Sequence, residues 1–242
     1  MTTYPDRAGS FHWTLLSLLR QSVVPDTILV ILSTTQFPGR SSDLPRTLRA
    51  LIRANGRRVR IIWDEGDRRS FKKILPALER YPERVIVTAD DDVLYPRDWL
   101  RWLIDGSERW PKCVVGTRGA RVRIQGRQLA PYATWPSAEL ERPGKNVLLT
   151  GRGGILYPPG SLHPAVLDYA TASKLCPDAD DLWLKTMSLR TGRECVVVGR
   201  AEEFPNTARQ HSALYRTNLQ RSGNDIALVA LDHAFDLVGL LT

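Results

Sequence analysis

The sequence is poor in cysteine and has no long apolar run. Its three cysteines, Cys113, Cys176 and Cys195, lie far apart and form no CxxC pair. Such a small, odd number argues against a disulfide scaffold and a structural zinc site, so we expect buried thiols in a reducing compartment. No run approaches the ~18 consecutive apolar residues of a membrane span, and the first residues lack the apolar stretch of a signal peptide. These absences predict a cytoplasmic protein.

The composition lacks any extreme. Of the 242 residues, 43% are hydrophobic and 25% are charged, which excludes disordered, collagen-like and low-complexity chains. The length suits one large domain or two small ones, with a substantial core. Because 34 Lys and Arg outnumber 26 Asp and Glu, the formal net charge is +8. Such a charge favours anionic partners such as nucleotides, acidic lipids or nucleic acid.

Strand and helix patterns alternate over the first hundred residues. Short runs rich in branched residues predict buried strands at 27–33, 59–63 and 84–89. Helical spacing places Phe11, Leu15, Leu18 and Leu19 on one face and recurs over 44–55 and 71–81. We expect Gly56 to end the second helix in a left-handed conformation, and Pro76 to disturb the third. This alternation is typical of βαβ units on a parallel sheet that is covered on both faces.

The second half of the sequence is less regular. Residues 113–124 and 147–157 have strand patterns that glycines interrupt, 179–189 has a helix pattern, and 194–198 is strand-like. The tail 225–241 is apolar, with acids at intervals that would suit an amphipathic helix. We therefore expect one α/β domain with mixed strands and loops in its second half.

Three consecutive acids follow the third predicted strand. In VIVTADDDVLYP, Asp90, Asp91 and Asp92 come directly after the apolar run, and open α/β sheets bind ligands beyond the carboxyl ends of their strands. Adjacent carboxylates repel each other, and a hard divalent cation that also binds substrate phosphates neutralises them. We interpret the segment as a metal–diphosphate site. The alternative is a solvated acidic turn in which Asp92 caps the helix near Pro96.

Five segments in a fixed order resemble the GT-A glycosyltransferases, and among these the family 2-like enzymes of bacterial surface-polysaccharide synthesis. The strand with its three acids resembles the DxD motif of that family. The other segments are 2–7 with 15–26 (first strand end and helix), 63–66 (WDEG, the acidic turn for the nucleoside), 151–159 (GRGGILYPP, the glycine-rich strand) and 178–184 (DADDLWL, the segment with the catalytic base). The resemblance spans roughly residues 1–225.

The resemblance implies a Rossmann-like GT-A fold with a mostly parallel central sheet flanked by helices. It implies a single domain over 1–242, with a nucleotide-binding half at about 1–105 and an acceptor and catalytic half at about 106–225. Residues 226–242 form the apolar tail.

The resemblance also implies roles for individual residues. The expected nucleotide-binding residues are Thr3, Tyr4, Asp64, Lys72, Lys73, Asp90, Asp91, Gly153 and Gly154. A divalent cation, Mn²⁺ or Mg²⁺, would be held by Asp92, Asp90 and His211. Asp181, or Asp180 as the runner-up, would act as the base that takes the proton of the acceptor hydroxyl.

Each of these residues also has a structural interpretation. Asp64 could be a turn acid or the N-cap of a helix before Phe71. Lys72 and Lys73 could be solvated, although a cation at a helix start opposes the helix dipole unless a phosphate lies nearby. Asp180 and Asp181 could serve only to cap the helix that follows them. The glycines could form a plain turn, and a loop histidine such as His211 could be solvated.

The sequence thus predicts an enzyme that moves a sugar from a nucleotide-diphosphate sugar to an acceptor hydroxyl on a glycan or lipid-linked glycan. Its expected role is surface polysaccharide or glycoconjugate synthesis, and the resemblance alone implies anomeric inversion. A metal-dependent phosphotransferase or nucleotidyltransferase could use the same acids.

The sequence also bears on two further classes of partner, nucleic acid and membrane lipid. A nucleic-acid-binding module is disfavoured because the arginines are spread along the chain without an aromatic-interleaved stripe, so no nucleic acid is expected as a partner. The net charge and the apolar tail suggest peripheral contact with the anionic inner face of a membrane. The alternative, which we favour slightly, is that residues 225–241 pack on the core.

Overall fold

The computed structural model describes residues 1–199, 204–207 and 223–242, and helices and strands alternate in its first half. The first half contains α1 (Pro5–Leu19), β1 (Ile28–Ser33), α2 (Arg46–Ala54), β2 (Val59–Asp64), α3 (Leu75–Arg80), β3 (Ile86–Thr88) and α4 (Trp99–Arg109). The second half contains β4 (Cys113–Gly116), β5 (Gly119–Arg121), β6 (Ile124–Gln125), β7 (Gln128–Leu129), β8 (Val147–Leu149), β9 (Ile155–Tyr157), α5 (Tyr169–Leu175), α6 (Asp180–Leu189), β10 (Glu194–Val197), α8 (Gly223–Phe235) and α9 (Leu237–Leu241). The α/β class is confirmed.

The strands form a parallel pair and a mixed sheet rather than one long parallel sheet. Strands β1 and β2 pair in parallel. The larger sheet has the order β10-β4-β9-β3, in which β10 is parallel to β4, whereas β9 is antiparallel to both of its neighbours. The pairs β5–β8 and β6–β7 are also antiparallel. The described residues therefore contain the expected mixed strands of the second half, but no extended parallel central sheet.

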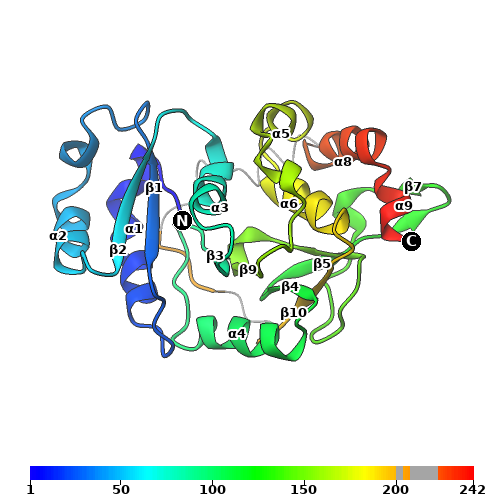
Figure 1. Cartoon of the computed structure of the whole chain (residues 1–242), viewed down its shortest axis with the longest axis horizontal. Helices are drawn as coiled ribbons and strands as arrows, with labels where there is room; N and C mark the ends of the chain where they lie inside the picture. The colour runs from blue at the N-terminus through cyan, green and yellow to red at the C-terminus, as the bar shows by residue number, and fades with distance from the viewer. Residues whose placement is uncertain (200–203, 208–222) are drawn as a thin grey trace.

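The first residues of the chain lie between the parallel pair and the larger sheet (Figure 1). The Met1 ammonium donates a hydrogen bond to the carbonyl of Leu29 at 3.0 Å, and the Ile31 N–H donates to the Met1 carbonyl at 2.9 Å. On the other side, the Thr3 hydroxyl donates to Asp91, just beyond β3, at 2.6 Å. This short segment thus joins β1 to the loop that carries the three acids.

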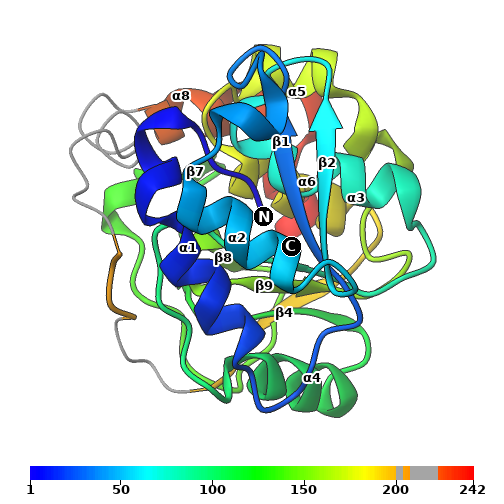
Figure 2. The same cartoon turned by 90° about the vertical axis from the view of Figure 1, so that its left-hand side faces the viewer.

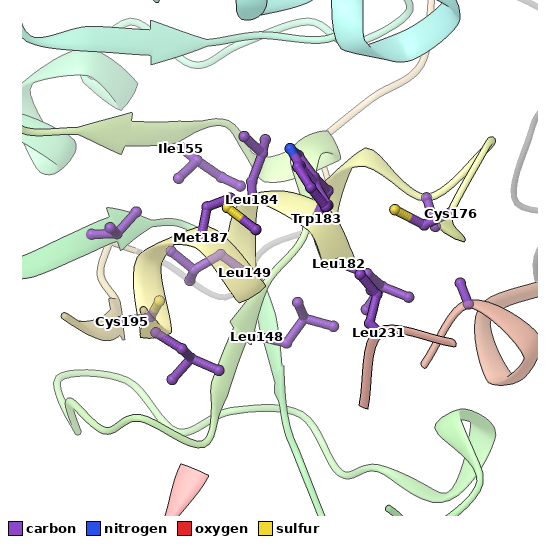
Figure 3. Packing of buried hydrophobic residues seen from close by; sticks show 14 of the residues in the cluster. Leu148, Leu149, Ile155, Cys176, Leu182, Trp183, Leu184, Met187, Cys195 and Leu231 are labelled. Carbon is purple, nitrogen blue, oxygen red and sulfur yellow. The ribbon is translucent and has the colours of Figure 1, made fainter. Parts of the chain in front are cut away.

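The larger sheet separates two hydrophobic cores, because successive side chains of a strand point to opposite faces. Val114 and Cys195 face a core around α6, whereas Val115 and Val196 face a core around α1, α2 and α4. We call these the α6 core and the α1 core. Figure 3 shows part of the α6 core, in which side chains of β8, α8 and β10 surround Trp183 and its neighbours on α6. All three cysteines are buried and free, as expected.

Two local predictions were wrong. The segment 71–81 is not one helix: a 3₁₀ turn, η2 (Arg69–Lys73), ends before α3 begins at Leu75. Pro76 lies in the first turn of α3, where its missing N–H breaks no helical hydrogen bond. Gly56 is not left-handed, because α2 ends one residue earlier, where the backbone N–H of Asn55 bonds to preceding carbonyls.

The C-terminal tail packs on the core, as we favoured. Leu231 of α8 and Leu237 of α9 are buried in the α6 core. The ring of Phe235 contacts Trp183 edge to face, with ring centroids 5.9 Å apart. No described helix is long and apolar enough to cross a bilayer.

Candidate active site

Four ionisable side chains converge where the loop after β3 meets η2 and the start of α6. Lys73 Nζ lies 3.2 Å from Asp90 Oδ1 and 2.9 Å from Asp180 Oδ2. A Cβ placed on Gly151 would lie 2.6 Å from Lys73 Nζ and 3.1 Å from Asp181 Oδ1, so a side chain there would displace the Lys73 ammonium. We call Lys73, Asp90, Asp180 and Asp181 the carboxylate cluster. The structure therefore brings together four of the residues that the sequence predicted.

A buried tyrosine fixes the loop that presents Asp90. The Asp90 N–H donates a hydrogen bond to Tyr95 Oη at 2.8 Å. The Tyr95 hydroxyl in turn donates a hydrogen bond to the Arg152 carbonyl at 3.4 Å. Arg152 belongs to the 3₁₀ turn η4 (Gly151–Gly153), which also supplies Gly151 to the cluster. Tyr95 thus ties the acidic loop to the glycine-rich turn.

Asp181 has the geometry of a base with one oxygen available. Its Oδ2 accepts a hydrogen bond from the Gly151 N–H at 2.9 Å, whereas Oδ1 is buried and has no hydrogen-bond partner. Burial, and secondarily the charge of Asp180, raise the pKa of Asp181 to about 7, although Lys73 and the Gly151 N–H oppose this rise. A carboxylate with a pKa near neutrality suits proton abstraction.

Asp180 and Asp181 lie in the first turn of α6, where acids are favourable, but neither caps the helix through its side chain. The N-cap of α6 is Ala179, and no side chain caps its first turn. Asp180 and Asp181 instead point to Lys73 and Gly151. Asp178, which precedes them, lies 2.6 Å from Arg69.

Lys72 and Lys73 are not solvated surface lysines, because their exposed fractions are 2% and 8%. Burial acts to lower the pKa of Lys73, but the charges of Asp180, Asp90 and Asp181 outweigh it and raise the pKa well above its usual value. Lys73 is therefore an ammonium that neutralises part of the cluster. Lys72 lies apart from the cluster and donates to Gln36 and Asp67, each at 2.7 Å.

The second and third acids of the loop are held by Arg7, which the sequence analysis did not single out. Arg7 Nη1 lies 2.8 Å from Asp91 Oδ1 and 3.1 Å from Asp92 Oδ2. Asp91, which also binds Thr3, is thus engaged in linking the N-terminal segment to the loop. The sequence does contain a sign of this role, because Arg7 lies in the first turn of a predicted helix. A cation is unfavourable there unless carboxylates lie nearby.

Asp64 lies at the end of β2 rather than at a helix N-cap. It is buried, its Oδ1 lies 3.3 Å from Arg68 Nη2, and its Oδ2 has no hydrogen-bond partner. Burial raises the pKa of Asp64, against the effect of Arg68. Neither Asp64 nor Lys72 joins the carboxylate cluster.

The two predicted glycines are explained by packing. Gly154 has φ +80°, and a Cβ there would overlap the indole of Trp99. The Gly153 carbonyl accepts hydrogen bonds from Trp99 Nε1 at 2.7 Å and from Thr117 Oγ1 at 2.6 Å. Gly151, which the sequence analysis did not separate from its neighbours, is the glycine that faces the carboxylate cluster.

The remaining predicted residues lie at the edge of the site or outside the described residues. Tyr4 is the N-cap residue of α1, and the Arg7 guanidinium lies 5.3 Å from the centre of its ring. His211 falls outside the described residues.

The donor set suits a cation that is shared with a ligand. Among the described residues, no group of three or more His, Cys, Asp and Glu side chains is arranged to hold a metal ion. Asp90 and Asp92 nevertheless offer hard oxygen donors, and Mg²⁺ commonly uses one or two carboxylates together with substrate phosphates. The five acids at 90–92 and 180–181 also outnumber the two cations that pair with them, Lys73 and Arg7. An excess of carboxylates of this kind is what a divalent cation bound with a diphosphate neutralises.

The chain matches none of the protein-family models with which it was compared, and no curated protein matches it.

Proposed function

We propose that this protein is a GT-A-like glycosyltransferase that moves a sugar from a nucleoside diphosphate to an acceptor hydroxyl. The observation that carries the proposal is the junction of Asp90, from the DxD-like loop, with Asp181, from the segment expected to hold the base, around Gly151. The two motifs are separated by ninety residues, and the resemblance requires them to share one site. Parallel pairing of β1 with β2 and of β4 with β10 is compatible with that fold.

The proposed reaction assigns each member of the cluster a task. The acceptor hydroxyl approaches Asp181 Oδ1, the oxygen without a partner, and transfers its proton there as its oxygen attacks the anomeric carbon. Lys73 holds Asp90 and Asp180 in place and reduces the repulsion among the acids. Asp92 and Asp90 would hold the divalent cation, which when bound stabilises negative charge on the departing nucleoside diphosphate. Inversion at the anomeric carbon is proposed from the resemblance alone.

A donor screen tests this function. The purified protein is incubated with a panel of nucleotide sugars and Mn²⁺ or Mg²⁺, and the release of nucleoside diphosphate is measured. We expect release from at least one donor, its loss in EDTA, and its recovery when the metal is restored. Release of pyrophosphate or inorganic phosphate instead would assign the acids to a nucleotidyltransferase or phosphotransferase.

The role of Asp181 is tested with Asp181→Asn and, as a matched control, Asp180→Asn. Loss of a general base typically costs ~10²–10⁴ in rate, so Asp181→Asn should lose transfer by about that factor and still bind the nucleoside diphosphate. Only ionised Asp181 can accept a proton. The wild-type kcat/KM should therefore rise with pH through about 7, the pKa of Asp181. Normal transfer by Asp181→Asn would overturn the assignment, and loss in Asp180→Asn alone would move the base by one residue.

A further inference from the structure

Residues 44–63 carry many arginines and no acid. This stretch contains no Asp or Glu, and its arginines are Arg46, Arg49, Arg53, Arg57, Arg58 and Arg60. It comprises α2, the turn after it and most of β2. Four of the six arginines are exposed and two are half-buried. Among the described residues, none of the six forms an ion pair, unlike Arg40 and Arg109, which pair with glutamates. We call these six residues the arginine face.

The geometry of α2 turns three of these cations outward together. Arg46, Arg49 and Arg53 are three and four residues apart and so lie along one stripe of the helix. The opposite stripe is already used, because Leu48 is fully buried in the α1 core, with Leu51 and Ile52 packed against it. Figure 2 shows α2 beside α1 on the outer side of the molecule, in front of β1 and β2.

We propose that the arginine face docks on the headgroups of an anionic lipid bilayer. Clustered cations near a negatively charged membrane surface are attracted to it additively. Since the apolar side chains of α2 pack in the core, none is free to insert between acyl chains as an interfacial amphipathic helix would do. The attachment is therefore electrostatic and shallow. It requires anionic lipid and is reversed by salt, which screens exposed charges beyond about 10 Å at 0.1 M.

The scarcity of aromatic residues on the arginine face favours a bilayer over a nucleic acid. Faces that bind single strands combine cations with aromatic rings on which bases stack, and residues 44–63 contain one aromatic residue, Trp63, which is half-buried. Docking needs neither nucleotide nor acceptor, so it stands or falls independently of the proposed glycosyl transfer.

Vesicle co-sedimentation tests the docking. The full chain is mixed with phosphatidylcholine vesicles, with or without phosphatidylglycerol, at low and high salt. We expect binding only to the anionic vesicles and release at high salt. Arg46→Gln with Arg53→Gln, at two exposed positions on the same stripe of α2, should lower the partition coefficient about twenty-five-fold, at a factor of about five for each cation.

The control removes the same charge from the other end of the molecule. Arg123→Gln with Arg127→Gln alters exposed residues around the β6–β7 hairpin, opposite α2 in Figure 1. This pair should change the partition coefficient by less than about two-fold, because a bilayer docked on α2 faces the opposite end of the molecule and salt screens distant charges. Equal losses in both pairs would mean that net charge, and not the arginine face, causes binding. Absence of binding to anionic vesicles at low salt would end the proposal.

Binding of RNA through Arg46 and Arg53 without vesicle binding would assign the face to nucleic acid. Melting temperatures verify that every variant is folded.

Discussion

Two adjacent lysines, Lys72 and Lys73, show how much a local environment decides. Both are buried, but Lys73 pairs with Asp90 and Asp180, whereas Lys72 binds Gln36 and Asp67. The side chain of Asp180 is 8% exposed and that of Asp67 is 35% exposed. Asp67 also keeps hydrogen bonds from Gln36 Nε2 and the Arg69 N–H. Loss of the lysine charge should therefore destabilise the folded protein more at Asp180 than at Asp67, because Asp180 is less exposed to water.

We expect Lys73→Met to lower the free energy of unfolding by about 3–5 kcal/mol, because it leaves buried carboxylates without their partner. Lys72→Met should lower it by less, about 1.5–3 kcal/mol, the value of hydrogen bonds to charged groups, because Asp67 is partly exposed and keeps two other donors. Methionine has a similar length and fills the same space in both variants. Urea unfolding at pH 7 measures the difference. Equal losses in the two variants would mean that Lys73 acts as packing rather than as the counter-ion of the cluster.

At the scale of elements, the sequence predicted where most strands and helices lie but not how the strands pair. Helical spacing of apolar residues located α1, and apolar-rich segments located β1, β2 and α6, whose side chains are mostly buried or half-buried. The antiparallel insertion of β9 between β3 and β4 depends on contacts between residues about forty to seventy positions apart, which no local pattern encodes. In the same way, three acids in a row indicated an anionic site. That Lys73 pairs with Asp90 whereas Arg7 pairs with Asp91 depends on the tertiary structure.

The glycine-rich turn before β9 contains a backbone conformation that glycine alone adopts readily. Gly154 has φ +80° and ψ 144°, outside the left-handed region, and lies against the Trp99 ring, whereas Gly160 has φ +66° and open space where a Cβ would be. Gly160→Ala should lower the free energy of unfolding only by the left-handed backbone penalty, about 1–2 kcal/mol. Gly154→Ala should lower it by about 1–3 kcal/mol more, because its backbone is strained for other residues and the added methyl group displaces Trp99. Urea unfolding compares the two variants, and equal losses would mean that neither the backbone conformation of Gly154 nor Trp99 adds a penalty.

At the scale of the whole molecule, both predicted halves contribute to one site. Lys73 and Asp90 come from the half at about 1–105, for which nucleotide binding was predicted, and Gly151, Asp180 and Asp181 come from the other. The site therefore depends on the two cores being held in register. The larger sheet does this physically, since Val114 of β4 faces the α6 core and the next residue, Val115, faces the α1 core.

Because the two cores share a sheet, we expect them to unfold together. Leu48→Ala in the α1 core and Leu231→Ala in the α6 core remove fully buried side chains, and each should cost about 2–5 kcal/mol. Val229→Ala, at a position of α8 that is 72% exposed, is the control and should change stability by less than about 0.5 kcal/mol. Far-UV circular dichroism and tryptophan fluorescence should report one coincident transition in every variant, as two-state unfolding requires.

If Leu48→Ala shifted only an early unfolding transition and Leu231→Ala only a late one, the two halves would fold independently. The carboxylate cluster would then lie between two domains, and its geometry would depend on their docking rather than on a common sheet.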